Sequence, residues 1–192
     1  MELVFASANQ NKVTEIQKLV GEKIKLLSLK DIGCTEEIEE SGTTFQENAL
    51  IKARYVFETY KCNCFADDSG LEVEALNNEP GVYSARYAGE PKNDNRNTQK
   101  LLKELKSNSN RNARFKTVIA LLINGKEQFY EGEISGKIAL HPSGSGGFGY
   151  DPVFIPDGYD RTFAQMTLEE KNHISHRAIA IQKLVDYLNS GG

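Results

Sequence analysis

The stretch Phe65-Ala66-Asp67-Asp68-Ser69-Gly70-Leu71 sets two adjacent carboxylates between apolar residues and a glycine. An apolar run enters it, and Leu71, Val73 and Ala75 alternate with glutamates as the chain leaves it. This pattern predicts a strand, an acidic turn and a second strand. Neighbouring carboxylates repel each other unless a cation or a proton reduces their charge. The pair is therefore either an exposed acidic turn or part of a functional site.

The composition is that of a globular protein with one substantial core. The chain has 192 residues, of which 39% are hydrophobic and 26% charged, and this fits one domain, residues 1–192, with room for two lobes. The net charge of -4 argues against nucleic-acid binding, which needs clustered lysine and arginine. The sequence has neither a signal peptide nor an apolar run of about 18 residues, so we expect a soluble cytoplasmic protein without a membrane partner.

The cysteines Cys34, Cys62 and Cys64 are odd in number and lack a repeated metal-ligand spacing. They argue against a disulfide framework. In a Cys-x-Cys pair on a strand both side chains point to one face, which favours buried thiols over a metal site.

A polar loop joins a first predicted strand, Leu3 to Ala6, to a helix with apolar residues at helical spacing from Val13 to Val20. The loop is Ser7-Ala8-Asn9-Gln10-Asn11-Lys12. Backbone N–H groups at the helix N-terminus and the charge of Lys12 together suit a polyphosphate. The simpler interpretation is that Ser7, Asn9 or Asn11 caps the helix, and the two roles are compatible.

Four glutamates crowd the loop after a second predicted strand, Ile24 to Leu29; they are Glu36, Glu37, Glu39 and Glu40. Such a run is usually a solvated acidic face. One of them can instead reach Asp68 and complete a magnesium site, because Mg²⁺ typically takes one or two carboxylates together with substrate phosphates.

A capping box, Thr44 with Glu47, opens a predicted helix whose apolar stripe ends at Tyr60. Lys52 lies off this stripe, so it is either a solvated surface lysine or a second phosphate contact. The helix leads back to the strand that carries the two aspartates. Alternating strands and helices predict an α/β or α+β layered fold.

The middle of the chain predicts a helix over Asp94 to Leu105 and a hairpin of Ala113–Ile123 and Gln128–Ile134, turned at Asn124-Gly125. Before them lies the aromatic segment Tyr83-Ser84-Ala85-Arg86-Tyr87. Aromatic residues at this spacing usually belong to a core or an interface, and an exposed cluster would suggest a dimer surface.

A glycine-rich segment, Ser143 to Pro152, lacks the pattern of a P-loop. Its glycines allow close backbone approach, so it can hold phosphate or let a nucleobase lie on Phe148, although such segments are also plain linkers.

A second capping box, Thr167 with Glu170, precedes Ser175-His176-Arg177 and a final amphipathic helix. Cations in a first helical turn oppose the helix dipole. This placement indicates either a contact with an anion or a carbonyl oxygen, or an ordinary exposed turn.

The motifs of this chain resemble, in order and spacing from Leu3 to about Leu188, those of the inosine/xanthosine triphosphate pyrophosphatase family. They are Ser7-x-Asn9-x-x-Lys12, Glu39-Glu40-Ser41-Gly42-Thr43-Thr44-Phe45-x-Glu47-Asn48-Ala49, Ala66-Asp67-Asp68-Ser69-Gly70-Leu71, Pro80-Gly81-x-Tyr83-Ser84-Ala85-Arg86-Tyr87, Gly146-Gly147-Phe148-Gly149-Tyr150-Asp151-Pro152 and Ser175-His176-Arg177.

The resemblance implies a homodimeric α/β protein with a long mixed central sheet, flanking helices and two lobes around a nucleotide-binding groove. It implies Mg²⁺-dependent hydrolysis of non-standard purine nucleoside triphosphates (ITP, dITP, XTP) between the α and β phosphates, which gives the monophosphate and pyrophosphate and cleanses the nucleotide pool.

By family position, Glu39 and Asp68 bind magnesium, with Glu40 a further candidate, and Asp68 orients or deprotonates the attacking water. The implied substrate-binding residues are Ser7, Ala8, Asn9, Gln10, Asn11, Lys12, Lys52, Ser69, Phe148, Gly149, Tyr150, Asp151, Lys171, His176 and Arg177. Phe148 stacks on the purine. Donors such as backbone N–H groups or Arg177 favour a 6-oxo group, because the 6-amino group of adenine leaves them unpaired.

Three alternatives use the same residues. Asp68-Ser69-Gly70 fits the aspartic-protease tripeptide, but that chemistry needs a second such aspartate and the sequence holds one copy. A sensor that binds nucleotides without hydrolysis is the second, and a pyrophosphatase for another modified nucleotide is the third.

Overall fold

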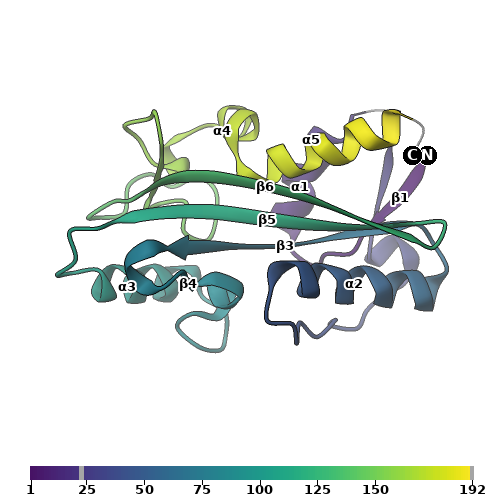
Figure 1. The fold of residues 1–192 in the computed structure, drawn as a ribbon, viewed down its shortest axis with the longest axis horizontal. Helices are drawn as coiled ribbons and strands as arrows, with labels where there is room; N and C mark the ends of the chain where they lie inside the picture. Colours follow the sequence, from purple (N-terminus) through teal and green to yellow (C-terminus); the bar gives the residue numbers. More distant parts are fainter. Residues whose placement is uncertain (22–23, 191–192) are drawn as a thin grey trace. The chain divides into compact units, whose positions relative to one another are not determined.

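The computed structural model describes residues 1–21 and 24–190, and the chain divides into two compact units. The first comprises Met1–Asp68, Thr117–Gly132 and Arg177–Gly192, and the second Ser69–Lys116 and Glu133–His176. Strands β3 (Cys64–Val73), β5 (Asn112–Ile123) and β6 (Lys126–Ile138) contribute residues to both units (Figure 1).

The other elements belong to one unit each, except that α5 begins with the last residue of the second unit. The first unit holds β1 (Glu2–Phe5), α1 (Gln10–Leu19), β2 (Lys25–Ser28), the 3₁₀ helix η1 (Lys30–Ile32), α2 (Phe45–Tyr60) and α5 (His176–Asn189). The second holds η2 (Glu74–Leu76), β4 (Glu79–Pro80), η3 (Gly81–Arg86), α3 (Asp94–Glu104), β7 (Phe154–Pro156), η4 (Phe163–Gln165) and α4 (Leu168–Ile174).

Among the residues that the structure describes, seven strands form one mixed sheet in the order β2-β1-β3-β5-β6-β7, with β4 beside β3. Strand β1 runs parallel to β2 and β3, whereas β4 and β7 run antiparallel to β3 and β6. The register pairs Val4 with Cys64 and Phe5 with Phe65. The predicted mixed sheet with flanking helices is confirmed.

The predicted acidic turn is wrong, because β3 continues without a break through Asp67, Asp68, Ser69 and Gly70. Nearly every residue of this strand is buried. A run of polar residues usually indicates a turn because it needs water, but here side chains from neighbouring helices satisfy the carboxylates instead.

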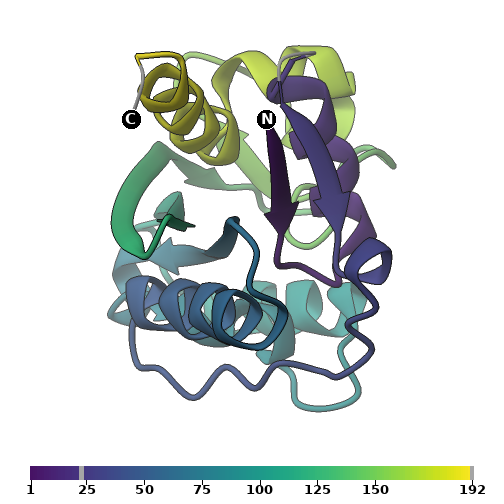
Figure 2. The ribbon, with the colours of Figure 1, turned by 90° about the vertical axis from the view of Figure 1, so that its right-hand side faces the viewer.

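Side-chain alternation along the strands builds two apolar layers in the first unit, one on each face of the sheet. Leu3, Phe5, Phe65, Ile119 and Leu121 pack with residues of α1 and α5. Their chain neighbours point to the other face and pack with α2; they are Val4, Ala6, Cys64, Ala66, Ala120 and Leu122. Figure 2 shows α2 on one side of these strands and α1 and α5 on the other.

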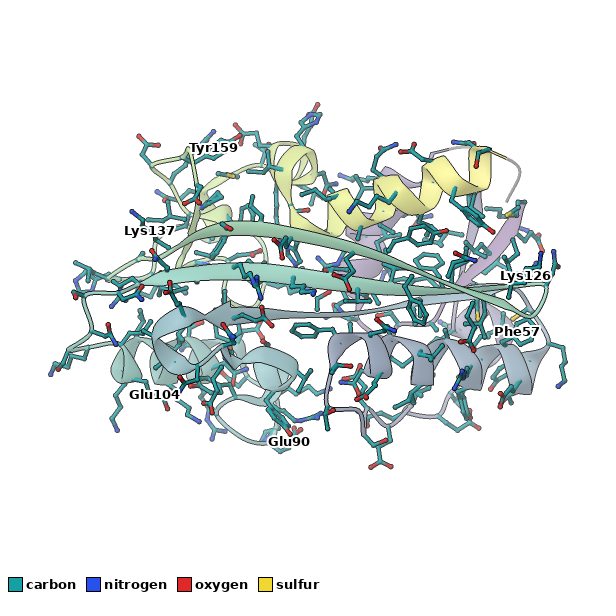
Figure 3. The ribbon with its side chains drawn as sticks, viewed as in Figure 1. Phe57, Glu90, Glu104, Lys126, Lys137 and Tyr159 are labelled. Atoms are coloured by element: carbon teal, nitrogen blue, oxygen red, sulfur yellow. The ribbon has the colours of Figure 1, made fainter. Side chains whose placement is uncertain are left out.

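The second unit has a separate core in which aromatic rings meet. The Phe115 ring lies 4.7 Å from that of Phe154 and 6.0 Å from that of Phe163, measured between centroids. Leucines of α3 and residues of β3 complete the cluster. Burial also alternates along β6: Lys137 is exposed, and its neighbours Gly136 and Ile138 are buried (Figure 3).

Local signals placed the helices and the hairpin correctly. Both predicted capping boxes are present, Thr44 with Glu47 at α2 and Thr167 with Glu170 at α4. The turn residues Asn124 and Gly125 have φ angles of 51° and 78°, as a tight two-residue hairpin turn requires. Within residues 1–21 and 24–190, no helix combines the length and apolar character needed to cross a bilayer.

Two leucines allow a matched test of the first core. Leu121 is fully buried and Leu140 is 70% exposed. We expect Leu121→Ala to lower the free energy of unfolding by about 2–5 kcal/mol and Leu140→Ala by less than about 0.5 kcal/mol. Urea unfolding of both variants measures the difference, and equal losses would contradict this assignment of the core.

Candidate active site

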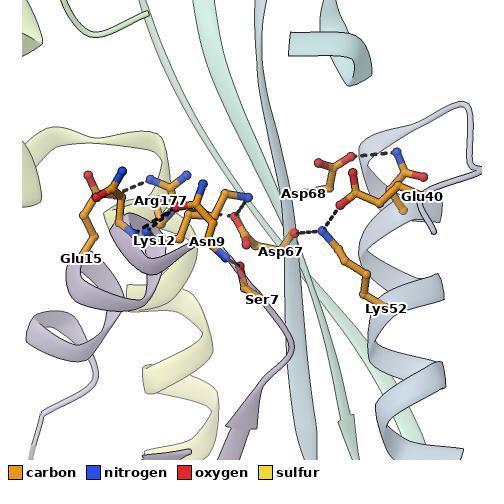
Figure 4. A network of polar contacts seen from close by, with 11 residues as sticks. Ser7, Asn9, Lys12, Glu15, Glu40, Lys52, Asp67, Asp68 and Arg177 are labelled. Atoms are coloured by element: carbon orange, nitrogen blue, oxygen red, sulfur yellow. Dashed lines mark hydrogen bonds and ion pairs between the residues drawn. The ribbon is translucent and has the colours of Figure 1, made fainter. Parts of the chain in front are cut away.

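The two aspartates of β3 point to opposite faces of the first unit, because they are neighbours on an extended strand. Asp67 lies two residues after Phe65, so it shares the face of Phe65 toward α1 and α5. Asp68 lies two residues after Ala66, so it shares the face of Ala66 toward α2. Figure 4 shows the two carboxylates directed to different sides of the strand. Adjacent carboxylates are tolerated here because each has its own partners.

Asp67 is fully buried, and cations approach it from three elements. Its Oδ2 lies 2.9 Å from Lys12 Nζ of α1 and 3.6 Å from Arg177 Nε of α5. Lys52 Nζ of α2 donates to the backbone carbonyl of Asp67 at 2.6 Å. Burial acts to raise the pKa of Asp67, but the charges of Lys12, Arg177 and Lys52 outweigh it and hold this pKa well below the usual range.

Arg177 also donates to the carboxylate of Glu15, and this pair is buried. Glu15 follows Lys12 by three positions, so both lie on the same face of α1. The alternative of an ordinary exposed first turn for His176 and Arg177 is wrong, since both side chains are buried.

Asp68 accepts a hydrogen bond from Asn48 Nδ2 at 3.0 Å. The other atom of this amide, Oδ1, accepts from the backbone N–H of Gly42 at 2.8 Å, so Asn48 ties the acidic loop to the catalytic candidate. Burial raises the pKa of Asp68, and nearby Glu40 adds to the effect, against the lowering by Lys52 and Lys12.

Lys52 is buried and donates to the Glu40 carboxylate, so its interpretation as a solvated surface lysine is wrong. Burial lowers the pKa of Lys52, but the carboxylates of Glu40, Asp67 and Asp68 outweigh it and raise the pKa overall. Glu40 is half-buried, while Glu39 is exposed. Asp68 and Glu40 therefore form an acidic pair beside an ammonium group, whereas the role predicted for Glu39 stays a prediction.

The loop before α1 contains the predicted cap. Asn9 Oδ1 accepts from the backbone N–H groups of Asn11 and Lys12 at 3.0 and 3.3 Å. Ser7 Oγ accepts from the N–H of Asn9 at 3.2 Å. Ala8, Gln10 and Asn11 are exposed. The cap interpretation is confirmed for Asn9, and the loop also delivers Lys12 to Asp67.

In the second unit the glycine-rich segment folds around Asp151. Its Oδ2 accepts from the backbone N–H of Phe148 at 3.0 Å and lies 2.6 Å from Lys171 Nζ, and Asp151 and Lys171 are both buried. Lys171 Nζ lies 4.8 Å from the centre of the Phe148 ring. The structure thus brings Phe148, Asp151 and Lys171 together.

The other predicted site residues of the second unit are Gly149, Tyr150, His176 and Ser69. Gly149 donates its N–H to Asp94 at 2.6 Å, and Tyr150 donates its hydroxyl to the Ser84 carbonyl at 2.8 Å. His176 stacks on Phe115, with ring centres 4.7 Å apart. Ser69 is half-buried in β3.

Comparison with known proteins finds similarity over nearly the whole chain. A sequence model of the Ham1 family matches residues 3–187. This chain belongs to the Ham1 family. A dITP/XTP pyrophosphatase of Flavobacterium psychrophilum is 56% identical over 190 residues, which cover 99% of this chain and 100% of the relative. A dITP/XTP pyrophosphatase of Bacillus subtilis is 47% identical over 195 residues, 98% of either chain.

Solved structures give the same result. The Ham1 protein of Staphylococcus aureus has a TM-score of 0.91 at 40% identity, with all of both chains covered. A HAM1 protein of Coxiella burnetii also has a TM-score of 0.91, at 41% identity, with 99% of both chains covered.

From the sequence we assigned no role to Glu15, Asn48 or Asp94, which contact the candidate residues Arg177, Asp68 and Gly149, respectively. Asn48 stood inside a recognised motif, but one asparagine has many possible roles. Glu15 is buried next to Ile16 on α1, and a buried carboxylate needs a cation.

Two glycines test the fold of the segment around Asp151. Gly147 and Gly158 both have positive φ, 69° and 83°. A Cβ on Gly147 would overlap the Asp151 carboxylate, whereas a Cβ on Gly158 would meet open space. We expect Gly158→Ala to cost about 1–2 kcal/mol and Gly147→Ala to cost about 3 kcal/mol or more. Equal losses in urea unfolding would contradict the contact.

The depressed pKa of Asp67 predicts how stability depends on pH. Its charge stabilises the folded state fully above about pH 5 and progressively less as pH falls below the unfolded value of about 4. Relative to wild type, Asp67→Asn should lose about 3–5 kcal/mol at pH 6. The difference should shrink by about pH 3. Guanidinium unfolding at both pH values measures it, and an unchanged difference would rule out a low pKa.

Proposed function

We propose that this chain hydrolyses non-standard purine nucleoside triphosphates, namely ITP, dITP and XTP, to the nucleoside monophosphate and pyrophosphate. The observation that carries the proposal is the division of labour on β3. Asp67 is neutralised by buried cations, while Asp68 is kept on the other face with a raised pKa. The full-length similarity to dITP/XTP pyrophosphatases supports the purine specificity.

Lys12, Lys52 and Arg177 supply the positive charge that a triphosphate needs. They come from three different helices, so their relative positions depend on the folded first unit. The loop of Ser7, Ala8, Asn9, Gln10 and Asn11 adds backbone N–H groups at the start of α1.

Asp68, with Glu40 or Glu39, is the proposed magnesium ligand. A buried carboxylate with a raised pKa and an acidic neighbour favours binding of a cation, and Mg²⁺ takes few protein carboxylates when phosphates complete its shell. When bound, the ion would neutralise charge on the phosphates. Asn48 holds the Asp68 carboxylate in place.

The reaction needs one water and an in-line displacement. Asp68 orients the water and accepts its proton while the water oxygen bonds to the α-phosphorus; the bond from that phosphorus to the α–β bridging oxygen breaks, and pyrophosphate leaves. The lysines and Arg177 stabilise the charge that develops on the phosphates.

For the base we propose Phe148 as the stacking surface, shaped by Gly149, Tyr150 and Asp151, with Lys171 next to the ring. Ser69 and His176 complete the proposed substrate contacts. Donors from the backbone would favour a 6-oxo purine over adenine. We also propose that residues 1–192 act as one domain of two lobes around a nucleotide groove, in a cytoplasmic homodimer.

The deciding experiment is to measure pyrophosphate release from ITP, XTP, GTP and ATP, with and without Mg²⁺, and to identify the nucleotide product. We expect monophosphate and pyrophosphate, with ITP and XTP preferred to ATP by about 100-fold or more. Asp68→Asn should lose at least about 100-fold in kcat while the protein remains folded. Diphosphate with orthophosphate would indicate a γ-phosphatase, and no turnover would favour a sensor.

A further inference from the structure

Asp67 has no place among the proposed substrate or metal contacts, yet it is fully buried with Lys12, Lys52 and Arg177 close to it. Its side chain faces α1 and α5, away from the face of Asp68 (Figure 4). A buried carboxylate is retained only when its charge is matched, so its position requires an explanation.

We propose that Asp67 is a positioning residue of the proposed pyrophosphatase reaction and acts through Lys12, with Arg177 as its second cation. It is the fixed counterion that holds the lysine ammonium group in place for the phosphates. It binds neither the substrate nor the metal. The inference rests on the proposed function.

The geometry distinguishes the two cations. Arg177 is also held by Glu15, so its guanidinium keeps a carboxylate partner when Asp67 is removed. Lys12 depends on Asp67, 2.9 Å away, and its side chain is 14% exposed. Lysine also has more rotatable bonds than the short, strand-borne aspartate, so the pair restricts the lysine.

A double-mutant cycle tests this dependence, because residues that act through each other give non-additive effects. With Lys12 present, Asp67→Asn should lower kcat/KM for ITP by about 30-fold or more, with both a higher KM and a lower kcat. In a Lys12→Met background the same change should leave kcat/KM within about threefold, because the lysine through which Asp67 acts is then absent.

Two controls accompany the cycle. Glu127→Gln removes a carboxylate from an exposed ion pair with Arg54 in the same unit and should leave kcat/KM unchanged. For Asp67→Asn, the Mg²⁺ concentration for half-maximal rate should stay within about twofold of wild type.

Equal losses from Asp67→Asn in both backgrounds would overturn the proposal. A rise of about tenfold or more in the Mg²⁺ requirement would also overturn it, because Asp67 would then be a metal ligand. If Asp67→Asn alone fails to fold, Lys12→Met and the double variant still decide: an additional loss of about tenfold or more in the double variant overturns the proposal.

Tripolyphosphate binding, measured by calorimetry on the same proteins, separates this inference from the proposed function. Asp67→Asn should weaken binding by about tenfold when Lys12 is present and should not weaken it when Lys12 is replaced. If wild type fails to hydrolyse ITP, the proposed function fails, and this binding comparison still supports or overturns the role of Asp67.

Discussion

Asp67 and Asp68 are buried on opposite faces of strand β3, and each carboxylate is matched by a group from a neighbouring helix. Helices α1 and α5 provide Lys12 and Arg177 for one face, and α2 provides Asn48 for the other. The same helices form the apolar layers of the first unit, so the packing that stabilises it also sets the positions of the polar groups. Folding of the first unit therefore also brings these polar groups into place.

The two carboxylates differ because their surroundings differ. The charges of nearby cations hold the pKa of Asp67 low despite its burial, whereas for Asp68 burial outweighs the nearby lysines and raises the pKa. Pairs of titratable groups whose environments separate their pKa values are typical of sites that divide chemical roles between similar side chains. In this chain the two carboxylates with different surroundings are adjacent residues, because their side chains lie on opposite faces of one strand.

Features that depend on local sequence were predictable. Capping boxes at Thr44 and Thr167 and the turn at Asn124-Gly125 each involve a few neighbouring residues, and all three were correct. The turn at Asp67-Asp68 was wrong because the partners that allow burial stand far along the chain, at Lys12, Lys52 and Arg177. Lys52 was ambiguous for the same reason: its carboxylate and carbonyl partners come from other elements. Motif resemblance selected Asp68 together with Lys12, Lys52 and Arg177, which the structure places around Asp67 of β3, but it gave no role to Glu15 or Asn48.

The register of β3 against β1, with Val4 opposite Cys64 and Phe5 opposite Phe65, has a chemical consequence beyond stability. A slip of one residue would exchange the faces of the two aspartates, so that Asp67 would lie on the side of Asn48 and Asp68 on the side of Lys12 and Arg177. The same residues would still be present, yet each carboxylate would meet the surroundings of the other. Single-residue insertions or deletions between residues 60 and 67 should therefore be selected against by chemistry even where a compact fold survives.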